Sequence, residues 1–184
     1  ETPDVLVKNV TNEVLELIRN DKDIQSGDTR KAGQLIESKI LPHFDFNRMT
    51  ALAVGRDWKS ASAEQKTALI NEFRTLLIRT YANALTSYKN QSIDFKPFKG
   101  KAEETETIVR TEVKQPGAKA IPIDYSLRKD DAGAWKVFDV VVGGVSLVTN
   151  YRDQFRQQVV TGGIDGLIKS LQEKNKAPAP AAVK

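Results

Sequence analysis

Apolar residues in the first half of the chain recur at intervals of three and four, the spacing of one face of an α-helix. In the first such segment they are Val7, Val10, Val14, Leu17 and Ile18. Pro3 and Asp4 precede this segment and are typical of a helix start. The same spacing predicts helices over Thr29–Leu41, ended by Pro42, and over Asp45–Val54.

A longer helix is predicted after residue 62. Ser62 and Gln65 have the spacing of a capping box, in which each side chain accepts a hydrogen bond from the other residue's backbone amide. The helical apolar positions that follow are Leu69, Phe73, Leu76, Leu77, Tyr81, Ala84, Leu85 and Tyr88. This segment is therefore expected to be the longest helix and the spine of the fold.

After Asn90 the apolar spacing changes to two, which is typical of strands. Four strands are predicted, over Ile93–Phe98, Glu103–Lys114, Ala120–Arg128 and Trp135–Val142. Pro116–Gly117 and residues 130–133 form short turns, so the sheet is expected to be antiparallel. In the third strand one face carries Ile121, Ile123, Tyr125 and Leu127, while polar residues and Pro122 alternate with them. That apolar face must be covered by the helices.

Helical spacing returns over Tyr151–Val160 and Ile164–Leu171, separated by Gly162–Gly163. Residues 174–184 are rich in Ala and Pro and lack large apolar side chains, so we expect a flexible tail whose ordering entropy nothing offsets. The chain is predicted to be a single α+β domain over residues 1–173, with a twisted antiparallel sheet of about four strands covered by several helices.

Composition narrows the function classes. The 184 residues include 40% hydrophobic and 28% charged residues, carry a net charge of +4 and contain no cysteine. Disulfides and thiol nucleophiles are thereby excluded, and no apolar run approaches the ~20 residues needed to span a bilayer. Basic residues are scattered among acidic ones, which argues against nucleic-acid binding. The first residue is Glu1, as expected after signal-peptide removal or trimming of a longer chain.

Candidate catalytic residues are few, and we predict no catalytic or metal site. His43 is the single histidine, and a general base needs an oriented partner that the sequence does not identify. Asp139 interrupts an apolar strand, where it is either a buried proton acceptor or a residue of the outer face. Gly143–Gly144 and Gly162–Gly163 lack the lysine and the strand-to-helix context of a phosphate-binding loop.

The apolar surface of the strands is the informative feature. Val109, Val113 and the residues of the third strand contribute to it, together with either Val137 and Val141 or Phe138, Val140 and Val142 of the fourth. An ordinary core beneath the helices explains such a surface. A ligand cavity explains it as well, and the pattern does not decide between the two.

A resemblance to a known family covers almost the whole chain. The run from Trp135 to Phe155 reads WKVFDVVVGGVSLVTNYRDQF and resembles the hallmark of the MlaC family, also called the toluene-tolerance family. Further matching segments are Phe44–Met49, Trp58, Ala63–Gln65, Phe73–Ala82 and Gly166–Ile168. Gly143 departs from the pattern, since the family often has a larger, acidic residue there.

The resemblance implies a fold like the NTF2-like cone, with an apolar slot between helices and sheet, and a soluble periplasmic carrier without a cofactor. Its cargo would be phospholipid. Its implied partners are an inner-membrane ABC transporter with an MCE-type subunit and an outer-membrane lipoprotein and porin complex, and its implied role is maintenance of outer-membrane lipid asymmetry.

The residues expected to contact lipid tails lie on the apolar faces of the predicted strands and helices. They are Leu77, Tyr81, Leu85, Val109, Val113, Ile121, Ile123, Tyr125, Leu127, Phe138, Val140, Val142, Leu147 and Tyr151. Arg152 is the candidate for a head-group contact. Two alternatives stay open: an NTF2-like isomerase or dehydratase with Asp139 as base, and an interaction module whose sheet is fully packed with no ligand cavity.

Overall fold

One antiparallel sheet of five strands runs in the order β1-β2-β3-β4-β5. The computed structural model describes residues 1–88, 91–101 and 103–177. The strands are β1 (Ser92–Phe95), β2 (Glu106–Lys114), β3 (Ile121–Lys129), β4 (Trp135–Val142) and β5 (Val145–Ser146). The sequence predicted β4 with these bounds but missed β5, because a two-residue strand is too short to show alternation.

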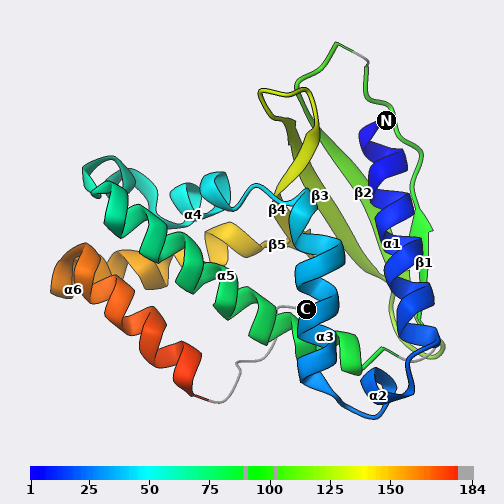
Figure 1. Cartoon of the computed structure of the whole chain (residues 1–184). Helices are drawn as coiled ribbons and strands as arrows, with labels where there is room; N and C mark the ends of the chain where they lie inside the picture. The colour runs from blue at the N-terminus through cyan, green and yellow to red at the C-terminus, as the bar shows by residue number, and fades with distance from the viewer. Residues whose placement is uncertain (89–90, 102, 178–184) are drawn as a thin grey trace.

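Within the described residues, six α-helices pack around the sheet; five of them precede the strands in the sequence and one follows them. They are α1 (Pro3–Arg19), α2 (Lys22–Gln25), α3 (Thr29–Leu35), α4 (Phe46–Val54), α5 (Ala63–Thr86) and α6 (Leu147–Lys176). In Figure 1, α1 stands in front of the sheet and α3 lies between α1 and α5, while α4, α5 and α6 lie together beside the sheet. The predicted α+β class, with helices over an antiparallel sheet, is confirmed.

The predicted capping box is present at the start of α5. The Gln65 backbone N–H donates to Ser62 Oγ at 3.1 Å, and the Ser62 N–H donates to Gln65 Oε1 at 2.8 Å. Asp28 and Asp45 cap α3 and α4 in a similar way, through the backbone N–H groups of Lys31 and Arg48. Each of these helices therefore begins where a side chain satisfies an otherwise unpaired amide.

The segment predicted as one helix over Thr29–Leu41 changes its winding near its end. A π-helical turn, η1 (Ile36–Ile40), follows α3, and a 3-10 turn, η2 (Leu41–His43), follows η1. Pro42 lacks a backbone N–H and disfavours helical geometry in the preceding residue, so a regular helix ends here. Ile36 and Ile40 of the π-helical turn, and Leu41 directly after it, face the interior of the fold.

Three separate apolar clusters make up the core. The helical cluster is formed by α4, α5 and α6 and includes Met49, Phe73 and Phe155. A second joins α1, α2, α3 and α5 around Ile18 and Ile36. A third lies between α1 and the sheet. The interior is thus divided among three apolar clusters.

Helix α6 turns back on itself at Gly163, whose φ of 71° and ψ of −171° are not helical. Its final turns then pack along α5, where Asn175 Nδ2 donates to the Glu72 carbonyl at 2.9 Å. The helix break predicted at Gly162–Gly163 lies here. The tail was predicted to begin at residue 174, whereas the helix continues to Lys176, and residues 178–184 lie outside the described residues.

Candidate functional site

An apolar cavity of about 310 Å³ lies at the junction of the three clusters. We call it the main cavity. Its walls come from η1, the start of α4, the C-terminal part of α5, β3, β4 and the start of α6. The lining residues are Ile36, Ile40, Leu41, Phe44, Phe46, Met49, Leu77, Tyr81, Ala84, Leu85, Ile123, Tyr125, Val140, Val142 and Leu147.

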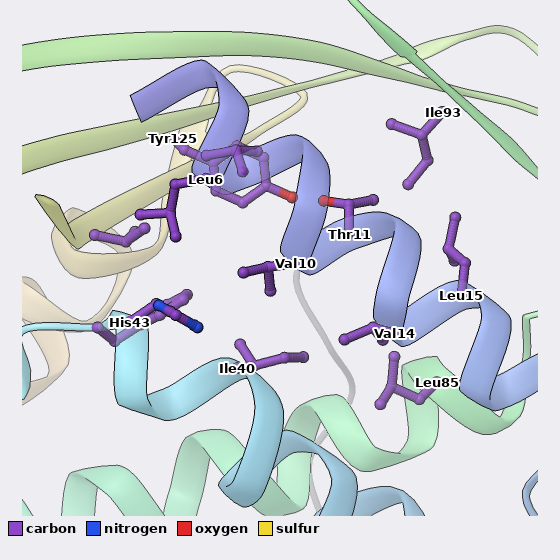
Figure 2. Close-up of a pocket in the computed structure, with 13 residues that line it drawn as sticks. Leu6, Val10, Thr11, Val14, Leu15, Ile40, His43, Leu85, Ile93 and Tyr125 are labelled. Carbon is purple, nitrogen blue, oxygen red and sulfur yellow. The ribbon is translucent and has the colours of Figure 1, made fainter. Parts of the chain in front are cut away.

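A second cavity of about 200 Å³ adjoins the main cavity on the side of α1. We call it the side cavity, and Figure 2 shows it between α1, η1 and the sheet. Its lining residues are Leu6, Val7, Val10, Thr11, Val14, Leu15, Ile40, His43, Phe44, Leu85, Ile93, Tyr125 and Val137. Four residues line both cavities: Ile40, Phe44, Leu85 and Tyr125. The two cavities therefore adjoin each other and share a wall.

Strand register supplies the sheet wall of the main cavity. Ile123 pairs with Val142 and Tyr125 with Val140 across β3 and β4. Directly opposed residues of an antiparallel pair point to the same face, so these four side chains form one apolar patch facing the helices. The sequence predicted all four for this wall.

A β-bulge changes the face that the start of β4 presents. The register shifts between Ser126 and Leu127, which pair with Asp139 and Val137 and leave Phe138 unpaired. A bulge inserts one extra residue and so reverses the alternation beyond it. Val137 consequently lies on the inner face with Val140 and Val142. The sequence pattern had predicted Phe138 for that face.

Phe138 lies in a groove on the outer face of the sheet, together with Ile108 and Ser126. The Arg48 guanidinium sits 4.9 Å from the centre of its ring, a favourable cation–π arrangement. The structure thus places Phe138 outside both cavities, contrary to the sequence-based expectation, and the bulge is the reason.

Other residues chosen from the sequence divide into two groups. Those lining a cavity are Leu77, Tyr81, Leu85, Ile123, Tyr125, Val140, Val142 and Leu147. Val109 and Leu127 are instead buried in the cluster beneath α1, and Tyr151 lies in the helical cluster. Val113 and Ile121 pair with each other near one end of the sheet and line neither cavity.

Arg152, the candidate for a head-group contact, is an exposed residue of α6. Its Nε donates to the Leu52 carbonyl at 3.1 Å. It lines neither the main cavity nor the side cavity. Its side chain therefore joins α6 to α4 and stands away from the apolar lining.

Sequence reasoning missed the contribution of the N-terminal helices. Val7, Val10 and Val14 line the side cavity, and Ile36 and Ile40 line the main cavity. The helical spacing identified these positions as an apolar face, which is the available signal. The spacing of apolar residues does not show whether such a face packs against other side chains or lines a cavity.

The Asp139 carboxylate accepts hydrogen bonds that hold the structure together. It accepts from Ser146 Oγ at 2.6 Å and from the backbone N–H groups of Val140 at 2.8 Å and Val148 at 3.2 Å. Ser146 in turn accepts from the Thr149 N–H at 3.1 Å. Asp139 therefore joins β4 to the start of α6, where a helix N-terminus favours negative charge, and it does not point into either cavity.

Two tyrosines inside the fold titrate abnormally. Burial raises the pKa of Tyr125 to about 12, because the charged phenolate is poorly solvated there. Burial also raises the pKa of Tyr151, although a hydrogen bond with Thr80 opposes that shift.

Within the described ranges, no group of three or more His, Cys, Asp or Glu side chains is placed to hold a metal ion.

Comparison with known proteins gives consistent results. The family model described as MlaC protein matches residues 8–173. The intermembrane phospholipid transport system binding protein MlaC of Haemophilus influenzae is 27% identical over 179 residues, covering 96% of this chain and 84% of that protein. The toluene tolerance protein ttg2D of Pseudomonas putida is 25% identical, covering 90% and 76%.

A solved structure shares the fold. The phospholipid-binding protein from Ralstonia solanacearum, determined in complex with a phospholipid, superposes with a TM-score of 0.90 and 37% sequence identity. The match covers 98% of this chain and 100% of that one.

Of the helices that the structure describes, none is both long and apolar enough to cross a membrane.

Proposed function

The chain belongs to the MlaC family, and from that premise we propose that it is a phospholipid carrier whose main and side cavities hold acyl chains. The observation that carries the proposal is the pair of adjoining apolar cavities between the sheet and the helices. The same fold in a relative was solved with a phospholipid bound. Ligand sites typically measure roughly 300–1,000 Å³, and the main cavity is of this order.

Energetics explain why a carrier needs such a lining. Two acyl tails contain about 28 methylenes, and at ~0.8 kcal/mol each their exposure to water costs on the order of 20 kcal/mol. Branched aliphatic side chains such as Ile123, Val140 and Leu77 replace the contacts that the bilayer provides. Because the lipid is about equally stable in both places, transfer in either direction has a small net free energy.

The carrier works without covalent chemistry in this proposal. The one carboxylate considered as a base, Asp139, is held by Ser146 and by the backbone of α6. His43 lines the side cavity, but none of the other described residues that line it is acidic and could orient the ring. The relatives, likewise, are named for transport and binding.

We further propose that the protein works in the periplasm, between an outer-membrane lipoprotein and porin complex and an inner-membrane ABC transporter with an MCE-type subunit. The name of the Haemophilus influenzae relative, an intermembrane transport system binding protein, supports this. Spontaneous lipid exchange with bare liposomes is expected to be slow and exchange with the transporter fast. Equal rates with and without the transporter would contradict the partner-dependent step.

The main test is lipid retention measured by native mass spectrometry. The purified protein is expected to carry a diacyl phospholipid, which solvent extraction then identifies. Ile123→Trp places a large ring in the main cavity and should reduce retained lipid at least tenfold. Ile108→Trp, on the outer face of the sheet where Ile108 is 45% exposed, is the matched control and should retain lipid.

Two outcomes would overturn the carrier function. The first is a wild-type protein that neither holds phospholipid after purification nor takes it up from vesicles. The second is a folded Ile123→Trp variant with the same lipid content as wild type. Far-ultraviolet circular dichroism of both variants verifies that each is folded.

A further inference from the structure

Thr11 differs from five other threonines inside helices. Thr50, Thr67, Thr75, Thr80 and Thr161 each donate a hydrogen bond to the carbonyl four residues earlier. This is the usual arrangement for a helical threonine. Thr11 makes no such bond within the described chain, and its hydroxyl faces the side cavity from α1.

Two more polar side chains share this cavity. Figure 2 shows the hydroxyl groups of Tyr125 and Thr11 pointing toward each other and the His43 ring directed inward from η2. Among the described residues, none hydrogen-bonds to the side chains of Thr11, His43 or Tyr125. Polar groups in an apolar lining usually have partners, so these three are arranged for a partner that binds in the cavity.

We infer that Thr11, His43 and Tyr125 form a polar subsite that binds the ester carbonyl oxygens of the phospholipid and so fixes which end of the lipid occupies the side cavity. This inference rests on the proposed carrier function. The tails then extend along the shared wall of Ile40 and Leu85 into the main cavity, which is larger and almost wholly apolar.

The chemistry of the subsite favours an uncharged acceptor. Both hydroxyls and a ring N–H of His43 can donate hydrogen bonds, and an ester carbonyl only accepts them. A phosphate in the same place would be a buried charge, which is costly without a paired cation. No lysine or arginine is among the described residues that line the side cavity. Carbonyl oxygens therefore fit this subsite, and the phosphate remains outside it.

The experiment compares a diacyl phosphatidylcholine with its dialkyl ether analogue of equal chain length, which lacks both carbonyls. The lipid-free protein is incubated with vesicles containing equal amounts of the two, and native mass spectrometry gives the ratio bound. Wild type should prefer the ester lipid roughly fivefold, the factor expected for one net hydrogen bond. Tyr125→Phe should bring the ratio close to one, and Thr11→Val should lower it partly.

Tyr88→Phe is the matched control, because it removes the same hydroxyl at a position that lines neither cavity. It should keep the ester preference of wild type. Equal uptake of both lipids by wild type, or an unchanged ratio in both folded variants, Tyr125→Phe and Thr11→Val, would overturn the polar subsite while leaving the carrier function standing. A wild-type protein that binds neither lipid would refute the carrier function itself.

Discussion

The helical cluster and the cavity region are both apolar, yet one is filled and the other is hollow. In the helical cluster Phe73 packs edge-to-face against Tyr151 and Phe155, with ring centres 5.3 and 5.4 Å apart. These rings fill the space between α5 and α6 and leave Phe73 with 0% exposure. Aromatic side chains of this size bury large areas and dominate core energetics.

In the cavity region the facing elements carry mostly branched aliphatic side chains, which are too short to meet across the gap. Ile123 and Val140 on the sheet face Ile36 and Leu77 on the helices. The difference shows that side-chain length at a few facing positions, more than the share of apolar residues, decides whether an interior becomes a core or a binding space.

The largest expected effect comes from truncating a ring in the filled region. Phe73→Ala should lower the free energy of unfolding by about 3–5 kcal/mol, because a fully buried aromatic leaves a cavity that its neighbours cannot close. Leu85→Ala, in the shared wall of the two cavities, should cost only about 1 kcal/mol because its side chain already faces open space. Urea unfolding of the lipid-free proteins measures both.

Lipid content should respond in the opposite order. Leu85→Ala should reduce the lipid held after purification, while Phe73→Ala should affect it only through its loss of stability. Equal destabilisation by the two substitutions would mean that the cavity wall is packed as tightly as the helical cluster.

An intermediate effect is expected at the junction of the two regions. Asp139→Ala removes the carboxylate that accepts hydrogen bonds from Ser146 and Val148 at the start of α6. Loss of a helix cap should cost about 1–2 kcal/mol. Asp124→Ala is the matched control, because its ion pair with Arg110 is long, at 3.9 Å, and exposed pairs contribute little. Thermal unfolding measures the stability of both variants. Equal losses of stability in the two would contradict the role of Asp139 at the start of α6.

The smallest effect concerns titration of Tyr125 in the hollow region. Its pKa of about 12 in the folded protein exceeds the ~10 of an unfolded tyrosine. The folded state therefore holds its proton more tightly, so its stability is unaffected below about pH 10 and falls as the pH rises toward about 12. At pH 10.5 the loss should be below about 1 kcal/mol.

Tyr125→Phe should lack this part of the alkaline destabilisation, as measured by urea unfolding between pH 8 and 11. Tyr151→Phe provides the comparison from the filled region, where the pKa is also raised. An unchanged pH dependence in Tyr125→Phe would mean that its hydroxyl is well solvated in the lipid-free cavity.

Spacing along the chain predicted most of the fold. The period of two located β4 and the period of three to four located α5, because each element repeats its pattern over several residues. The start of α5 was predictable for a local reason, since Ser62 and Gln65 cap it through contacts within four residues of each other. Such short-range rules need no knowledge of the partner elements.

The site was predictable only in part, because its walls depend on contacts between distant elements. The bulge at Phe138 reverses one end of β4, and nothing in the sequence of that strand marks it. Tyr151 has the right spacing to face the sheet but packs on Phe73. Val10 and Ile40 belong to apolar faces that read as ordinary core. Only the family resemblance pointed to a lipid slot.

The course of the chain through the helical cluster has a consequence for folding. The filled region is assembled from residues 46–77 and 147–171, which flank the whole sheet in the sequence, and Gln65 bonds to Asp165 across 100 residues. During synthesis on the ribosome, the strands that line the cavities therefore emerge before the last segment that secures their support. Until α6 is complete, the apolar residues of the cavity walls are exposed to other newly made chains. Aggregation is therefore expected mainly during this interval.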